Sequence, residues 1–377
     1  MSINNNITDI ESKIMKAPNI FHFATKELSQ DAFLCWLFSF ADIKYKKSEF
    51  EQLNILATKF IQRLIDNDKL KIESIKVAKQ IHKIDIWVEI NEDILLIIED
   101  KTNSKAGKNQ LEEYYNKATK ESPNRRISAV YFKTGNESTH TFIKSNTIGH
   151  WRAFKIEDIV VVLSPFEKKI SHPFFTDYLE ICLEKYNRLN DFERWIKKTE
   201  LNAEINDVVE AFYVHLEKDN VFYNWQSNDM RGVKYYYANN YKHSADGDTI
   251  YTELNRFDFK LILDLDLMGD ATGKKYKKFK DDLANRQVRF AYDELFKLFQ
   301  SKAPKLNLVK PKKYSCHNFL KFAVIPAEEW MVFNNDNTFN YQSSKKNIER
   351  INEAVTEVVK EHKKEIQTIV TKAKEYK

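Results

Sequence analysis

The sequence has no continuous apolar run that approaches the roughly 18 residues that a membrane-spanning helix requires. Its start, MSINNNITDI, also lacks the basic and then apolar segments that are typical of a secretory signal peptide. The three cysteines, Cys35, Cys182 and Cys316, are too far apart in sequence for a disulfide framework or a cysteine-based zinc site. We therefore expect a cytoplasmic protein that does not associate with membranes.

Glycine and proline are also scarce, with seven of each among 377 residues. This scarcity argues against glycine-rich phosphate-binding loops, and neither a GxxxxGK[ST] nor a GxSxG motif occurs. The apolar fraction of 42% and the charged fraction of 31% are ordinary for a globular protein with a hydrophobic core. The length suggests two domains, or one large domain with additions.

The formal net charge is only +5, but it is unevenly distributed. Residues 270–377 hold 23 Lys and Arg against 14 Asp and Glu, whereas the first 269 residues hold 37 against 41. The basic excess is densest at 274–280 and 305–313, and such runs either contact phosphate groups or form a solvated helix face. The candidate phosphate contacts are Lys274, Lys275, Lys277, Lys278, Lys310, Lys312 and Lys313.

The apolar spacing in the first part of the chain predicts an α/β core. We expect helices at 26–40, 49–66 and 107–119, strands at 71–79, 83–90, 94–101 and 126–133, and a short helix at 155–163. The order helix, three-stranded meander, helix, strand indicates a mixed sheet.

The second part of the chain predicts an α+β domain, because helical and alternating segments are interspersed. We expect two or more helices in 172–218, strands in 221–268, a helix at 276–300, short strands near 319–333 and a long charged helix at 344–376. The composition changes between 165 and 200, which predicts one domain over 1–170 and another over 171–377.

The segment 83–101 places two carboxylates opposite each other. Its two strands flank a three-residue turn, Asn91 to Asp93, so that Ile90 pairs with Ile94 and Asp85 lies opposite Glu99. Facing residues of an antiparallel pair share a face, with Cβ atoms roughly 5 Å apart. Two such carboxylates repel each other unless a cation lies between them, and all-oxygen ligands favour Mg²⁺ or Mn²⁺.

Lys101 shares the face of Glu99, two positions further along the strand. Either it is a salt-bridge partner that makes the acidic pair tolerable, or it helps to activate a metal-bound water and offsets charge at a phosphate. Charged residues at the end of the apolar run ILLII are costly without a function, which favours the second interpretation.

Asp85 followed by Glu99-Asp100-Lys101 resembles the D…(D/E)xK signature of the PD-(D/E)XK nuclease superfamily. IIEDK followed by QLEEYY resembles a pattern of one prokaryotic branch, and ELSQDAFLCWL at 27–37 resembles the first-helix pattern ExxHSxxLxxL of that branch. Gln30 and Asp31 replace the usual His and Ser, and Ile84 stands where the superfamily often has Pro. The resemblance covers about 20–165 and implies a restriction-endonuclease-like core.

The resemblance also implies roles for individual residues. Asp85, Glu99 and the main-chain carbonyl of Asp100 would bind the metal, and Lys101 would assist the attacking water. Glu27 would complete the metal site, although an acid at a helix start is also favourable for the helix dipole. Gln110 would support the active site, and Tyr114, on the same helix face, would contact nucleic acid or pack in the core.

The sequence thus predicts a nuclease that depends on Mg²⁺ or Mn²⁺ and hydrolyses phosphodiester bonds. The superfamily implies DNA rather than RNA as substrate and a role in prokaryotic defence against foreign DNA. Two alternatives remain: a catalytically silent nucleic-acid-binding protein, and a sensor or scaffold regulated by a partner through residues 171–377. A homodimer or a regulatory protein partner is compatible with each of them.

Overall fold

The computed structural model describes residues 18–24, 27–107, 109–138, 149–198, 206–222, 224–230, 233–239, 249–264, 282–311 and 319–375. Their contacts divide the chain into two compact units. The first unit comprises Met1–Thr102, Tyr114–Phe132 and Ala153–Leu183, and the second comprises Asn103–Glu113, Lys133–Arg152 and Glu184–Lys377. Among the described residues, every helix is too short or too polar to cross a membrane.

The first sheet is mixed and has five strands in sequence order. Its strands are β1 (Ile75–Ile81), β2 (Ile84–Ile90), β3 (Ile94–Lys101), β4 (Arg126–Lys133) and β5 (Trp151–Lys155). β1, β2 and β3 form an antiparallel meander. β3 lies between β2 and β4, and all eight of its residues are buried, so its continuous apolar run reflects a central strand.

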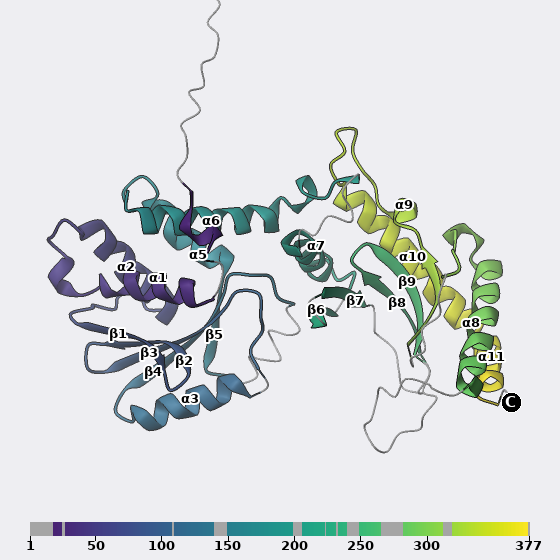
Figure 1. Ribbon diagram of the computed structural model, residues 1–377, viewed down its shortest axis with the longest axis horizontal. Coiled ribbons are helices and arrows are strands. Elements are labelled where there is room, and N and C mark those ends of the chain that lie inside the picture. The colour runs from purple at the N-terminus through teal and green to yellow at the C-terminus, as the bar shows by residue number, and fades with distance from the viewer. Residues whose placement is uncertain are drawn as a thin grey trace, which may run out of the picture. The chain divides into compact units, whose positions relative to one another are not determined.

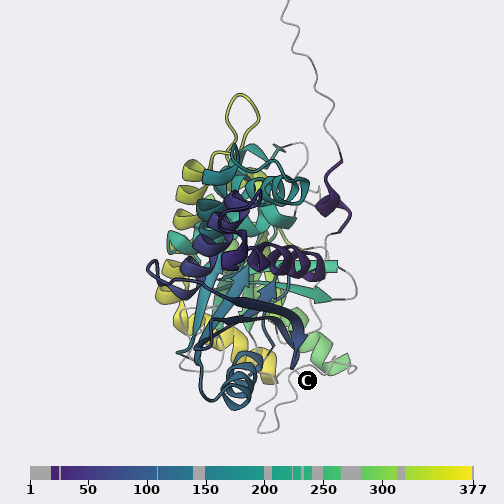
Figure 2. The ribbon, with the colours of Figure 1, turned by 90° about the vertical axis from the view of Figure 1, so that its left-hand side faces the viewer.

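Helices cover this sheet on both faces. Figure 1 shows α1 and α2 on one face and α3 on the other, and the turned view in Figure 2 agrees. The helices of this part are α1 (Glu27–Ser39), α2 (Glu51–Ile65), α3 (Gln110–Glu121), α5 (Ile156–Leu163) and α6 (Pro173–Asn190). The apolar sides of α1 and α2 meet through Phe38 and Phe60, whose ring centroids lie 5.6 Å apart. Phe60 also reaches Phe154 at 5.6 Å, which joins the helices to the sheet.

Two tight turns set the register of the meander. His82 and Lys83 connect β1 to β2, and both have positive φ, as hairpin turns with the right-handed strand twist require. Asn91 begins the turn between β2 and β3 with φ 50°, and its side-chain Oδ1 accepts hydrogen bonds from the backbone N–H groups of Glu73 and Ser74. The Asn91 side chain therefore ties this turn to the segment that precedes β1.

The second unit contains an antiparallel sheet in the order β10-β9-β8-β7-β6. Its strands are β6 (Asn224–Met230), β7 (Val233–Asn239), β8 (Thr249–Asn255), β9 (Asp258–Asp264) and β10 (Phe319–Ile325). Its helices are α7 (Asn206–Lys218), α8 (Asp282–Lys302), α9 (Ala327–Trp330), α10 (Tyr341–Glu361) and α11 (Lys363–Glu375). Aromatic rings pack α7 against α9, with Phe212 stacked on Trp330 at a centroid distance of 6.1 Å and Phe339 edge-on to Phe212 at 5.6 Å.

The structure confirms the expected α/β fold with a mixed sheet and a further domain. Three details of the expected elements are wrong. β5 was not expected, the segment 319–333 contains β10 and then the short helix α9, and the long helix at 344–376 is two helices that are separated at His362.

Candidate active site

The hairpin of β2 and β3 has the predicted register. Ile90 pairs with Ile94, and Ile86 pairs with Ile98. The next positions along the two strands are Asp85 and Glu99, which therefore come together on one face of the sheet.

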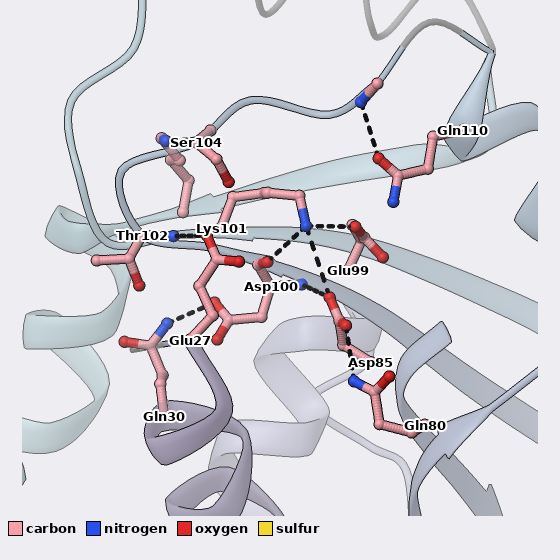
Figure 3. A network of polar contacts seen from close by, with 12 residues as sticks. Glu27, Gln30, Gln80, Asp85, Glu99, Asp100, Lys101, Thr102, Ser104 and Gln110 are labelled. Carbon is pink, nitrogen blue, oxygen red and sulfur yellow. Dashed lines mark hydrogen bonds and ion pairs between the residues drawn. The ribbon is translucent and has the colours of Figure 1, made fainter. Parts of the chain in front are cut away.

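The ammonium group of Lys101 lies among three of the four oxygen-bearing groups that were predicted to bind a metal (Figure 3). Its Nζ is 2.5 Å from Glu99 Oε1 and 3.8 Å from Asp85 Oδ2. The same Nζ donates a hydrogen bond of 3.0 Å to the main-chain carbonyl of Asp100. Two carboxylates and one carbonyl thus converge on a single positive charge.

Asp85 is held in place by two donors. Its Oδ2 accepts a hydrogen bond of 2.9 Å from the main-chain N–H of Asp100, and its Oδ1 accepts one of 3.0 Å from Gln80 Nε2 (Figure 3). Gln80 lies opposite Asp85 because the neighbouring pairs of β1 and β2 are Lys79 with Ile86 and Ile81 with Ile84. The hairpin turn at His82 and Lys83 therefore supplies a partner for the first carboxylate.

Glu27 reaches the end of β3 from the first turn of α1. Its Oε1 accepts a hydrogen bond of 3.0 Å from the main-chain N–H of Thr102, directly after Lys101 (Figure 3). Glu27 also contributes to the electrostatic field at Lys101, where its charge raises the pKa of the ammonium. α1 thereby adds a third carboxylate to the neighbourhood of the site.

Burial dominates the electrostatics of the site. The side chain of Glu99 is 1% exposed, and burial followed by the charge of Asp85 raises the pKa of Glu99 to about 8, against the opposing effect of Lys101. Burial alone would lower the pKa of Lys101, but the charge and hydrogen bond of Glu99, together with Asp85 and Glu27, raise it. Lys101 is therefore charged at neutral pH and compensates an acidic cluster that cannot be ionised cheaply without a cation.

The side chain of Asp100 points to the opposite face of β3, where it meets α1. Gln30 Nε2 donates a hydrogen bond of 2.5 Å to Asp100 Oδ1, and Gln30 Oε1 accepts one of 3.2 Å from the hydroxyl of Tyr178 on α6. Asp31 also lies against Asp100. Burial and then the charge of Asp85 raise the pKa of Asp31 to about 6, whereas burial and then the charge of Asp31 raise the pKa of Asp100 well above its usual range. Two buried carboxyl groups in contact favour one shared proton over two negative charges.

The oxygen groups at Lys101 have the chemistry that Mg²⁺ and Mn²⁺ prefer. Within the described ranges, no group of three or more His, Cys, Asp and Glu side chains is placed to hold a metal ion. The candidate set instead combines two side chains, Asp85 and Glu99, with the main-chain carbonyl of Asp100, and all three contact a cationic group. This donor set fits a hard divalent cation that retains several water ligands.

The other predicted residues make none of the contacts with Lys101 described above. Gln110 is the first residue of α3, and its Oε1 accepts a hydrogen bond of 2.8 Å from the backbone N–H of Gly107. Tyr114 is half-buried on the same helix. Lys310 is exposed but forms an ion pair of 2.6 Å with Asp293. The remaining basic candidates, Lys274, Lys275, Lys277, Lys278, Lys312 and Lys313, lie outside the described residues.

Three residues around the site were not singled out as functional from the sequence. Gln80 carried a usable signal, because a two-residue turn at His82 and Lys83 pairs it with Asp85. Gln30 was recognised only as a departure from the first-helix pattern, and Tyr178, 148 positions further on, carried no local signal. Alternation along β3 indicates that Asp100 faces away from Glu99, but it does not identify what Asp100 meets.

Comparison with known families agrees with this geometry. Residues 18–186 match the family model that is described as the PD-(D/E)XK nuclease superfamily. The match includes Glu27, Asp85, Glu99 and Lys101, and it ends within α6. No curated protein and no solved structure shows a significant match to the chain.

Proposed function

We propose that this protein is a nuclease that hydrolyses phosphodiester bonds with the aid of Mg²⁺ or Mn²⁺, because residues 18–186 match the family model of the PD-(D/E)XK nuclease superfamily. One observation carries the proposal: two carboxylates and one carbonyl converge on the Lys101 ammonium at the end of a buried strand. An arrangement of oxygens around a single positive charge is what a cation site needs, and a purely structural core does not need it.

In this proposal Asp85, Glu99 and the carbonyl of Asp100 hold the divalent cation. When bound, the cation lowers the pKa of a water ligand and neutralises charge on the phosphate. Gln80 and the N–H of Asp100 fix both oxygens of Asp85, so the first carboxylate is oriented before the cation arrives. Glu27 holds the chain at Thr102 and adds negative charge beside the site.

Lys101 acts in this proposal through the positive charge of its ammonium group. Its ammonium offsets the repulsion between Glu99 and Asp85 in the protein without metal. Next to a phosphate it stabilises the negative charge that develops on the non-bridging oxygens as the bond to the leaving group breaks. A hydrogen bond of 3.0 Å to the Asp100 carbonyl holds the ammonium beside the site in the protein without metal.

The superfamily alone supports DNA as the first substrate to test and a role in defence against foreign DNA. We assign substrate holding to the second part of the chain, residues 171–377, because its segment 270–377 holds 23 Lys and Arg against 14 Asp and Glu. Tyr114 and the lysines at 274–278 and 310–313 are the proposed contacts, with Gln110 supporting the site.

Purified protein incubated with plasmid, single-stranded DNA and RNA in Mg²⁺ or Mn²⁺ tests the proposal. We expect cleavage that EDTA abolishes and that Lys101→Met lowers by about 100-fold or more, because one charge at the transition state is lost. Lys345→Met is the matched control, since Lys345 pairs with Asp219 at 3.0 Å in the second unit. If the protein binds nucleic acid without cutting it, the nuclease proposal fails and the catalytically silent binding protein takes its place. Neither cutting nor binding would favour the partner-regulated scaffold.

A further inference from the structure

Asp100 belongs to the site through its main chain and to a buried cluster through its side chain. Its N–H donates to Asp85 Oδ2 at 2.9 Å, and its carbonyl accepts from Lys101 Nζ at 3.0 Å. Its side chain is fully buried on the opposite face of β3. Whatever fixes that side chain therefore also limits the rotation of the two adjoining peptide groups.

The buried cluster binds Asp100 through an ordered chain of donors and acceptors. Tyr178 donates its hydroxyl hydrogen to Gln30 Oε1 at 3.2 Å, and Gln30 Nε2 donates to Asp100 Oδ1 at 2.5 Å. An amide has one acceptor side and one donor side. Because the tyrosine hydroxyl occupies the oxygen of Gln30, the nitrogen is directed at the carboxyl group of Asp100.

Tyr178 is itself fixed by aromatic packing. Its ring stacks on Phe33 of α1, with centroids 3.9 Å apart and planes 21° apart. Phe21 contacts the same ring edge-on at 5.5 Å. The ring is 2% exposed, and burial raises the pKa of its hydroxyl well above the usual range, so the hydroxyl remains a donor.

We propose that Tyr178 and Gln30 are positioning residues, which act through the side chain of Asp100 to set the orientation of the Asp100 carbonyl and N–H at the site. The inference rests on the proposed function to the extent that this carbonyl is a metal ligand. Groups that orient ligands from behind typically change metal affinity or activity about 10- to 100-fold when they are removed. A cluster that only stabilises the fold would change neither quantity at constant stability.

The decisive variant is Tyr178→Phe, which keeps the stacked ring and removes only the hydroxyl group. Tyr213→Phe is the matched control in the second unit. The Tyr213 side chain is also fully buried, and its hydroxyl donates to the carbonyls of Leu254 and Arg256 at 3.3 and 2.9 Å. Both variants lose a buried donor, so both should lose a similar amount of stability in urea unfolding.

Two measurements on the full chain read the effect. Amide hydrogen exchange of residues 99–102 reports the bonds from Asp100 N–H to Asp85 and from Thr102 N–H to Glu27. Titration with Mn²⁺ reports the affinity of the site. For Tyr178→Phe we expect exchange in this segment to accelerate by about tenfold and Mn²⁺ binding to weaken by about tenfold. Tyr213→Phe should change neither, and Gln30→Met should exceed Tyr178→Phe because it removes the bond to Asp100 itself.

Unchanged exchange at residues 99–102 in both Tyr178→Phe and Gln30→Met would overturn the positioning role. Equal acceleration in Tyr213→Phe would overturn it as well, because the effect would then follow general destabilisation. If the wild-type protein does not bind Mn²⁺, the result would instead contradict the proposed metal-dependent function. The exchange data would still decide whether the network orients Asp100.

Discussion

Lys101 is the residue on which the charges of the site depend. Its ammonium contacts Glu99, Asp85 and the Asp100 carbonyl, which are also the groups proposed to bind the divalent cation. A divalent cation and an ammonium group repel each other at such short range. Cation binding therefore requires the ammonium to give up part of its contacts with these oxygens.

This competition gives a prediction at the residue scale. Lys101→Met should bind Mn²⁺ more tightly than the wild type, by about tenfold, because the oxygens no longer attract a competing charge. The same variant should cleave nucleic acid at least about 100-fold more slowly, as expected from the loss of its charge at the transition state. Isothermal titration with Mn²⁺ measures the first effect, and Lys345→Met, which removes a paired lysine elsewhere, should leave the affinity unchanged. Weaker binding by Lys101→Met would show that the lysine supports the cation rather than competing with it.

At the scale of elements, the turn between β2 and β3 determines which residues face each other. Asn91 adopts φ 50°, accepts from the backbone of Glu73 and Ser74, and donates from Nδ2 to the carbonyl of Lys71 at 3.0 Å. The side chain thus supports both the left-handed backbone and the neighbouring segment.

Asn91→Ala should lower the free energy of unfolding by about 2 kcal/mol, since it adds backbone strain and removes these hydrogen bonds. Asn91→Gly separates the two contributions, because glycine accepts the positive φ and lacks only the bonds. Its loss should be about half as large in urea-induced unfolding. Equal losses in the two variants would mean that the backbone conformation of Asn91 carries no strain.

The elements of the site were predictable from the sequence because its signals are local. Strict alternation and a three-residue turn are enough to bring Asp85 opposite Glu99 and to place Lys101 on the same face. β5 was missed because Trp151–Lys155 is short and runs directly into α5. The end of α10 was missed because no Gly or Pro marks His362, and the helical periodicity continues across it.

The contacts behind the site were not predictable for a different reason. Gln30 lies 70 positions from Asp100 and 148 positions from Tyr178 in the sequence. A single sequence carries periodicity within an element, but it carries no record of which elements pack together. The replacement of the usual His and Ser by Gln30 and Asp31 acquires a meaning only when α1 is seen against Asp100.

At the scale of the whole molecule, the basic excess and the proposed active-site residues lie in different parts of the sequence. The first 269 residues have 37 basic and 41 acidic side chains, whereas residues 270–377 have 23 and 14. A basic segment such as 270–377 would hold nucleic acid mainly through phosphate contacts, which release counterions and therefore weaken with salt.

Replacing Lys274, Lys275, Lys277 and Lys278 by Gln should lower the dependence of DNA affinity on salt, by up to about one unit of slope per lost contact. Mn²⁺ affinity should not change. The charge-matched control replaces Lys44, Lys46, Lys47 and Lys69, which are exposed in the first unit. Fluorescence anisotropy at several salt concentrations measures the slope. An equal reduction in both variants would show that total charge, rather than the 274–278 run, governs binding.

The burial of Glu99 and Lys101 also has an evolutionary consequence. A buried ion pair is often replaceable by apolar side chains with no loss of stability, or with a gain of about 1–4 kcal/mol, whereas losing one partner leaves an uncompensated charge. Both residues lie within a wholly buried strand of the first sheet. Selection for folding alone would therefore favour a lineage in which both have become apolar. We expect descendants that have lost the chemistry to have lost the two residues together, and those that retain either one to retain both.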